Sequence, residues 1–176
     1  MREKTITVYK YSELSDKAKE TAMYNFQQHE GYPWGDDALE SLKKGIEHFG
    51  CSLSDYSIDW LEPYRNSVSI AYPHQDVEEK DLKEMIFGMG SYNPDTLKGL
   101  GDCVFTGYCA DEGFADGVRE AYIRNHKRNL KELLLAGVAE WEIACRKDAE
   151  WQMSEEAFIE NADTNEWEFH EDGSMV

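Results

Sequence analysis

Apolar residues at helical spacing mark the first regular element of the chain. Ala18, Ala22 and Phe26 recur every four residues, which is typical of a helix that buries one face. Ser15 stands directly before this stretch as a candidate N-cap, and Leu14 is placed to pack back on the helix as a hydrophobic staple. The sequence therefore predicts an amphipathic helix that starts after Ser15.

A second amphipathic helix is predicted before Gly50, a residue type that commonly ends helices. Its apolar positions recur at intervals of three and four residues, at Leu39, Leu42, Ile46 and Phe49. Asp36 or Asp37 can cap its first turn.

Three further helical stretches follow. Residues 76–90 predict a short helix, residues 116–152 are rich in helix, and Ser154 is placed to cap a last short helix over residues 154–162. The second stretch ends in a long helix whose apolar stripe is Leu130, Leu134, Val138, Trp141, Cys145 and Ala149. Gly137 lies beside this stripe and would allow a neighbouring helix to pack closely.

Short runs of alternating or β-branched residues predict strands over residues 5–11, 51–60, 66–72, 103–109 and 166–170. The second and third are separated by the turn-like LEPYRN and predict an antiparallel pair. In the last, Trp167 and Phe169 alternate with charged residues. We therefore expect the acidic end of the sequence to be a folded strand fastened by two aromatic side chains.

These elements predict an α+β fold in a single domain over residues 1–176, with a small, mostly antiparallel sheet packed against several helices, including a long helix in the C-terminal half. Hydrophobic residues form 41% of the chain and aromatic residues 12%, which is too much for intrinsic disorder. No run approaches the roughly 18 to 20 apolar residues of a membrane span, and the beginning of the sequence lacks the apolar core of a signal peptide. We expect a soluble cytoplasmic protein.

Four cysteines, Cys51, Cys103, Cys109 and Cys145, occur in apolar or strand-like contexts. They form neither a CxxC pair nor a dense framework, so the sequence favours buried thiols in a reducing compartment.

The formal net charge of −18 is unevenly distributed. Residues 140–176 hold twelve acidic and two basic side chains, so they carry ten of the eighteen excess negative charges. Such a field repels the phosphates of nucleic acids and attracts basic surfaces. We therefore expect no direct nucleic-acid binding, and the lack of an apolar run long enough to span a membrane predicts no membrane partner.

No catalytic motif stands out. The sequence contains no P-loop, no GxGxxG, no HExxH and no GxSxG, and we expect a protein without cofactor or catalytic residues. Gly99 and Gly101 could aim Asp102 at a ligand, although a glycine turn with an Asx hydrogen bond explains them equally well.

Clustered carboxylates leave an enzymatic alternative open. If residues 166–172 form a strand, Glu166, Glu168, His170 and Asp172 share one face, and carboxylates with an imidazole suit divalent cations. Asp76, Glu78, Glu79 and Lys80 form a second acidic group with a lysine. The alternative is a small metal-dependent hydrolase or nucleotide-handling enzyme, whereas solvated acids on an edge strand or at a helix start need no metal.

Three segments together resemble a family of small proteins encoded by bacteriophages and prophages. They are YSELSDKAKETA, GLGDCVFTG and EWQMSEEAFIENADTNEWEFHEDG, which correspond to an ELSD-type first helix, a GxGDxxF loop-strand and an NE[YW]xFxxDG ending. The resemblance implies a phage origin and a setting in the cytoplasm of the infected bacterial host. It implies no particular activity.

The preferred hypothesis is a phage-encoded, acidic, non-catalytic inhibitor that binds a basic, nucleic-acid-binding surface of a host defence complex such as CRISPR-Cas, as an anti-CRISPR protein or DNA mimic would. On a strand, Glu166 and Glu168 would lie about 7 Å apart, close to the spacing of successive phosphates. The expected partner-binding residues are Glu140, Asp148, Glu155, Glu156, Glu160, Asp163, Glu166, Glu168, Glu171 and Asp172. The alternative without a binding partner is that this charge serves solubility alone.

Overall fold

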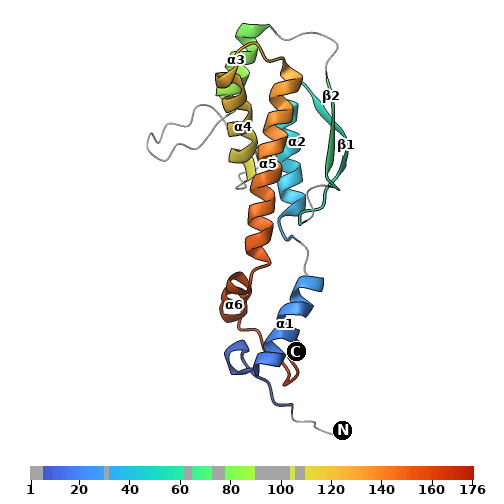
Figure 1. Ribbon diagram of the computed structural model, residues 1–176, viewed down its shortest axis with the longest axis vertical. Helices are drawn as coiled ribbons and strands as arrows, with labels where there is room; N and C mark the ends of the chain where they lie inside the picture. Colours follow the sequence, from blue (N-terminus) through green and yellow to red (C-terminus); the bar gives the residue numbers. More distant parts are fainter. Residues whose placement is uncertain (1–5, 30–31, 62–64, 73–77, 90–103, 106–109) are drawn as a thin grey trace, which may run out of the picture. The chain divides into compact units, whose positions relative to one another are not determined.

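The computed structural model describes residues 6–29, 32–61, 65–72, 78–89, 104–105 and 110–176 (Figure 1). The helical elements are η1 (Tyr11–Glu13), α1 (Asp16–His29), α2 (Gly35–His48), α3 (Glu79–Gly88), α4 (Ala110–Arg124), α5 (Leu130–Gln152) and α6 (Glu155–Thr164). The strands β1 (Ser52–Ser57) and β2 (Ser67–Ala71) form an antiparallel sheet. The predicted α+β class with a long helix in the C-terminal half is confirmed. Within these residues no helix is long and apolar enough to cross a membrane.

Contacts divide the chain into two compact units. The terminal unit joins residues 1–33 to residues 149–176, and the central unit holds residues 34–148. The expectation of one domain over residues 1–176 stays a prediction.

In the central unit, α4 and α5 meet where both helices carry glycine. A Cβ atom added to Gly117 would lie 2.9 Å from the Cα of Gly137, and one added to Gly137 would lie 2.6 Å from the Cγ2 of Val118. Both distances are too short for a side chain, so the absence of Cβ lets the two backbones approach closely. The expectation that Gly137 is a close-packing point is confirmed.

The apolar stripe of α5 supplies much of the central core. Trp141 is fully buried, and its ring meets that of Trp60 edge to face with centroids 5.7 Å apart. A Cβ on Gly35 would lie 2.7 Å from Trp60 Nε1, so the first residue of α2 leaves room for the indole. The beginning of α2, the segment after β1 and the middle of α5 are thereby packed together.

The sheet of the central unit is short and lies against α2 (Figure 1). Leu53 is paired with Ile70 and Tyr56 with Val68, and the register shifts between Leu53 and Asp55. The predicted antiparallel pair is confirmed, with one irregularity in β1.

Two serine caps set the helix starts of the terminal unit. The amide of Ala18 donates to Ser15 Oγ at 3.3 Å at the start of α1, and the amide of Ala157 donates to Ser154 Oγ at 3.2 Å at the start of α6. Both caps were expected from the sequence and both are confirmed, because this interaction depends only on residues three apart.

An aromatic cluster joins α1, α6 and the last residues of the chain. Phe158 is fully buried, with ring centroids 4.9 Å from Phe26, 5.1 Å from Tyr11, 5.7 Å from Trp167 and 6.2 Å from Phe169. Aromatic side chains bury the largest apolar areas and prefer such tilted and edge-to-face geometries. The expectation that Trp167 and Phe169 fasten this end of the chain is confirmed.

The strands predicted over residues 5–11 and 166–170 are wrong in extent, within the described part of the chain. Phe169 forms isolated antiparallel bridges with Tyr9 on one side and Met175 on the other. The amide of Gly173 donates to the His170 carbonyl at 3.0 Å, so the chain turns back directly after Phe169. This turn leaves too few residues for a regular strand.

Other boundaries also differ from expectation. The N-cap of α2 is Trp34, so Asp36 and Asp37 lie inside the first turn, where they interact with the positive end of the helix dipole instead of capping it. The helix predicted from residue 116 begins at Ala110. In the predicted strand 103–109, Val104 and Phe105 form a bend, and the other residues lie outside the described part of the chain. Residues 76, 77 and 90 of the predicted helix 76–90 also lie outside it.

Replacing Phe158→Ala should lower the free energy of unfolding of the terminal unit by about 3–5 kcal/mol, because it leaves a cavity inside the aromatic cluster. Its neighbour Ile159, which is 38% exposed, provides the control, and Ile159→Ala should cost about 1 kcal/mol or less. Urea unfolding and hydrogen exchange of the α1 and α6 amides measure both effects. Equal losses for the two variants would contradict the central role of Phe158.

Candidate functional site

Three of the expected partner-binding carboxylates form a ridge along α6. Glu156, Glu160 and Asp163 are spaced by four and three residues and are exposed. Phe158 faces the aromatic cluster from the opposite side of the helix. Glu155 is also exposed but lies beside this ridge, toward Tyr11. Burial of the apolar face of α6 therefore determines where its acids point.

After α6 the chain forms a tight hairpin. The amide of Val176 donates to the Glu168 carbonyl at 3.0 Å, and that of His170 donates to the Ser174 carbonyl at 2.8 Å. Glu166 precedes the hairpin with a φ of 54°, outside the β region. The expected separation of about 7 Å between Glu166 and Glu168 is the length of two residues in a β-strand. Because Glu166 is not in strand conformation, the expected separation has no basis in the structure.

The turn of this hairpin fixes one carboxylate. Asp172 Oδ1 accepts hydrogen bonds from the amide of Ser174 at 3.0 Å and from its hydroxyl at 2.7 Å, and these bonds lower the pKa of Asp172. Gly173 has a φ of 89°, and a Cβ there would lie 2.0 Å from the carbonyl oxygen of Ala18. Only glycine fits this position, which places the turn directly on α1.

The ten expected partner-binding residues divide between the two units. Glu140, which is exposed, and Asp148, which is half-buried, lie on the part of α5 that belongs to the central unit. The other eight lie in the terminal unit and are exposed; we call them the acidic segment. They are Glu155, Glu156, Glu160, Asp163, Glu166, Glu168, Glu171 and Asp172.

A described cation lies beside the acidic segment without pairing with one of its carboxylates: Lys10 Nζ donates to the backbone carbonyl of Glu166 at 3.1 Å. Several acids elsewhere form ion pairs with residues three or four apart on α2 and α4, such as Glu40 with Lys44 and Asp116 with Arg119. No carboxylate of the acidic segment is paired with a described lysine or arginine side chain. Their charges therefore remain available to an external partner.

The enzymatic alternative requires carboxylates grouped into a metal site, and the described residues contain no such group. Among the described residues, no group of three or more His, Cys, Asp or Glu side chains is arranged to hold a metal ion, and this includes Glu166, Glu168, His170 and Asp172. Asp102 and Asp76 lie outside the described residues. The described carboxylates of these two groups therefore form no metal site.

The cysteines that the structure describes, Cys51 and Cys145, are buried and form no disulfide. Burial raises the pKa of the Cys51 thiol, which disfavours the reactive thiolate. Cys145 is packed within the stripe of α5. Cys103 and Cys109 lie outside the described residues.

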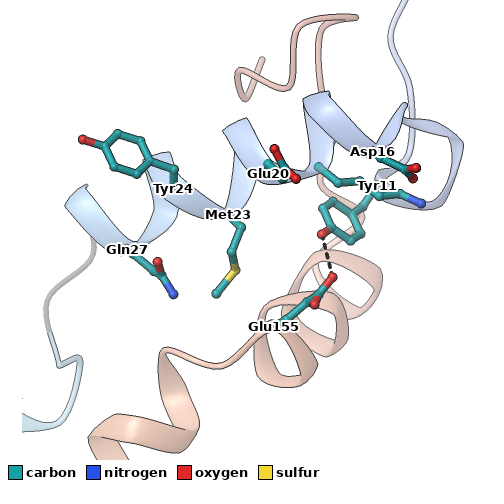
Figure 2. Close-up of a pocket in the computed structure, with 8 residues that line it drawn as sticks. Tyr11, Asp16, Glu20, Met23, Tyr24, Gln27 and Glu155 are labelled. Carbon is teal, nitrogen blue, oxygen red and sulfur yellow. Dashed lines mark hydrogen bonds between the residues drawn. The ribbon is translucent and has the colours of Figure 1, made fainter.

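A pocket of about 450 Å³ opens in the terminal unit between α1 and the start of α6 (Figure 2). It is lined by Tyr11, Asp16, Lys19, Glu20, Met23, Tyr24, Gln27 and Glu155. Met23 and Gln27 extend from α1 toward the α6 side of the pocket (Figure 2). The Gln27 amide nitrogen donates to the carbonyl of Met153 at 3.1 Å, which fixes its orientation.

Tyr11 connects this pocket to the aromatic cluster. Its hydroxyl donates to Glu155 Oε1 at 3.3 Å (Figure 2), and Lys19 Nζ lies 5.8 Å from the centre of its ring. Burial, and secondly the negative charge and hydrogen bond of Glu155, raise the pKa of Tyr11. The phenol is thus held neutral beside three carboxylates, and its ring already faces a cation.

The sequence matches no protein-family model and no curated protein, and the fold matches no solved structure. The resemblance to phage proteins therefore stays a prediction. The support for a binding function comes from two features of the terminal unit, the exposed acidic segment and the pocket between α1 and α6.

The acidic segment is visible in the sequence, whereas the pocket is not. On α1, Asp16, Glu20, Met23 and Gln27 recur at intervals of four and three residues, beside the apolar stripe of the same helix. This second stripe is visible in the sequence. Tyr11 and Glu155, however, are 144 residues apart, and only the fold brings them to it.

Titration of Tyr11 tests the electrostatics of the pocket. Because its folded-state pKa is raised above 10.0, the resulting stability is fully present below pH 10.0 and is lost as pH rises through the folded-state pKa. Glu155→Gln should lower the pKa of Tyr11, yet leave it above 10.0, because burial is the larger cause. NMR of the Tyr11 ring carbons against pH measures this pKa.

Glu156→Gln is the matched control. It removes the same charge one residue further along α6 without touching Tyr11, so the pKa of Tyr11 should change much less. An identical response to both substitutions would show that the surrounding field, and not the Glu155 contact, acts on the phenol.

Proposed function

We propose that this protein is a non-catalytic inhibitor whose acidic segment binds a basic, nucleic-acid-binding surface of a host protein. The observation that carries this proposal is the set of eight exposed carboxylates that pair with no lysine or arginine in the described part of the chain. An unpaired field of this kind attracts a surface of opposite sign and speeds its association.

The charge is concentrated in the terminal unit. Residues 1–33 and 149–176 hold fourteen acidic and five basic side chains, a net charge of −9 on 61 residues. The central unit holds twenty-two acidic and thirteen basic side chains, also −9, on 115 residues. Charge that served solubility alone would not need to be nearly twice as dense in one unit. This contrast favours a binding role for the terminal unit.

A folded scaffold makes the acids suitable for recognition. Packing in the aromatic cluster holds α6 in place. The close approach of Gly173 to the backbone of α1 holds the turn that carries Asp172. Carboxylates held in fixed positions lose less conformational entropy on binding than those of a disordered tail. The segment can therefore compete with the phosphates of a nucleic acid for the same basic groups.

The resemblance to phage proteins supports the choice of target. A protein made during infection gains by blocking a host defence, and CRISPR-Cas complexes bind nucleic acids through basic channels. We accordingly assign the partner as a basic host protein of such a complex, with anti-CRISPR or DNA-mimic activity in the bacterial cytoplasm.

Charge reversal tests the proposal. A variant with Glu156→Lys, Glu160→Lys and Glu168→Lys should lose inhibition by about tenfold or more, because it removes the complementary potential. Binding of labelled target DNA to purified CRISPR-Cas effector complexes, measured with increasing amounts of this protein, gives the inhibition constant. Inhibition by the unmodified protein should weaken as salt rises, because salt screens exposed charges.

A matched control changes the same total charge in the central unit. Asp36→Lys, Glu84→Lys and Glu112→Lys alter three exposed acids outside the acidic segment, and this variant should retain inhibition to within about threefold if local rather than total charge matters. Circular dichroism establishes that both variants are folded. An acidic-segment variant that inhibits as well as the unmodified protein would overturn the proposal.

A further inference from the structure

We propose that the pocket between α1 and α6 receives an arginine side chain of the partner, and so provides a specific anchor beside the diffuse attraction of the acidic segment. This inference rests on the proposed function for the source of the arginine. Its chemical basis is the lining of the pocket.

The charge of the pocket selects a cation. Three carboxylates line it, from Asp16, Glu20 and Glu155, against the single ammonium group of Lys19. An anionic ligand would meet this excess negative charge, whereas one added guanidinium would reduce it. The pocket volume of about 450 Å³ is in the range of sites for small organic groups, roughly 300–1,000 Å³.

The same carboxylates do not suit a bare metal ion. Within the described residues, no three His, Cys, Asp or Glu side chains are close enough together to coordinate one ion, and the pocket carboxylates are included in that finding. A guanidinium spreads its charge over a planar group with five N–H donors, so it can reach carboxylates that stand further apart. The arrangement therefore fits an extended organic cation.

Apolar walls favour arginine among such cations. Met23 and the ring of Tyr11 line the pocket beside the carboxylates, and Tyr24, 62% exposed, adds a second ring. Lys19 Nζ already lies 5.8 Å from the centre of the nearly buried Tyr11 ring, so the exposed Tyr24 ring is the one left for a further cation. Guanidinium stacks on aromatic rings and is more weakly hydrated than ammonium, while the methylene stem of arginine can lie along Met23.

Hydrogen-bonding groups in the pocket are pre-oriented. The Gln27 nitrogen is committed to the Met153 carbonyl, which leaves the amide oxygen of Gln27 as an acceptor. Glu155 accepts from Tyr11 through one oxygen, Oε1, and its side chain remains exposed. The Glu155 carboxylate can thus accept from a guanidinium without giving up its contact with the phenol.

The test uses the capped amino acid N-acetyl-arginine methylamide and two analogues, the lysine derivative and the citrulline derivative, which has nearly the shape of arginine but no charge. NMR titration of the intact protein should show saturable shifts of the Met23 methyl and Tyr11 ring signals, with a Kd on the order of millimolar. The citrulline derivative should cause no saturable shift, and the lysine derivative should bind at least about threefold more weakly.

Two variants that each remove one negative charge distinguish binding in the pocket from general attraction by the acidic segment. Glu155→Gln should weaken binding of the arginine derivative by about fivefold or more, whereas Glu156→Gln, its neighbour outside the pocket, should change it by less than about twofold. Glu20→Gln gives a second pocket variant on α1 that leaves the Tyr11 hydrogen bond intact. Circular dichroism again establishes folding.

Equal effects of Glu155→Gln and Glu156→Gln, equal shifts with citrulline, or binding of the lysine derivative as tight as that of arginine would each overturn the pocket assignment. These outcomes are distinct from failure of the proposed function. Inhibition of a defence complex without arginine binding refutes only the anchor, while arginine binding without inhibition of any defence complex refutes only the inhibitor.

Discussion

The packing of aromatic rings around Phe158 is the interaction on which the terminal unit depends. It brings residues from α1, α6 and the C-terminal hairpin into one core, with ring centroids between 4.9 and 6.2 Å from Phe158. The acids above this core repel one another, and repulsion among like charges opposes compact structure. Burial of large aromatic side chains offsets that repulsion, so the aromatic cluster and the acidic segment are two parts of one arrangement.

Tyr11 gives the same core a second use. Its ring completes the aromatic cluster, whereas its hydroxyl reaches Glu155 at the edge of the pocket. A change that loosens the cluster would therefore also displace the pocket wall. The neighbouring residues Glu155 and Glu156 differ in this coupling. Both are exposed acids of α6, yet only Glu155 contacts the phenol of Tyr11.

Features set by nearby residues could be predicted from the sequence, and features set by distant residues could not. Ser15 and Ser154 cap their helices through contacts three residues away, and Gly137 stands beside an apolar stripe that is visible in the sequence. The strand expected around Phe169 depended on where the chain turns, and the turn is fixed by Gly173 against α1. The acidic segment was predicted from composition, but the pocket needed α1 and α6 to be brought together.

Charge is handled differently in the two units, and this difference argues for recognition. In the central unit, acids on α2 and α4 pair with lysine or arginine one helical turn away, which satisfies them locally. Residues 155–176 hold the eight acids of the acidic segment and no lysine or arginine, so such pairing within the segment is impossible. A diffuse field attracts many basic surfaces and distinguishes poorly among them. Selectivity requires a contact of defined shape, and the pocket beside Tyr11 supplies one next to the highest charge density.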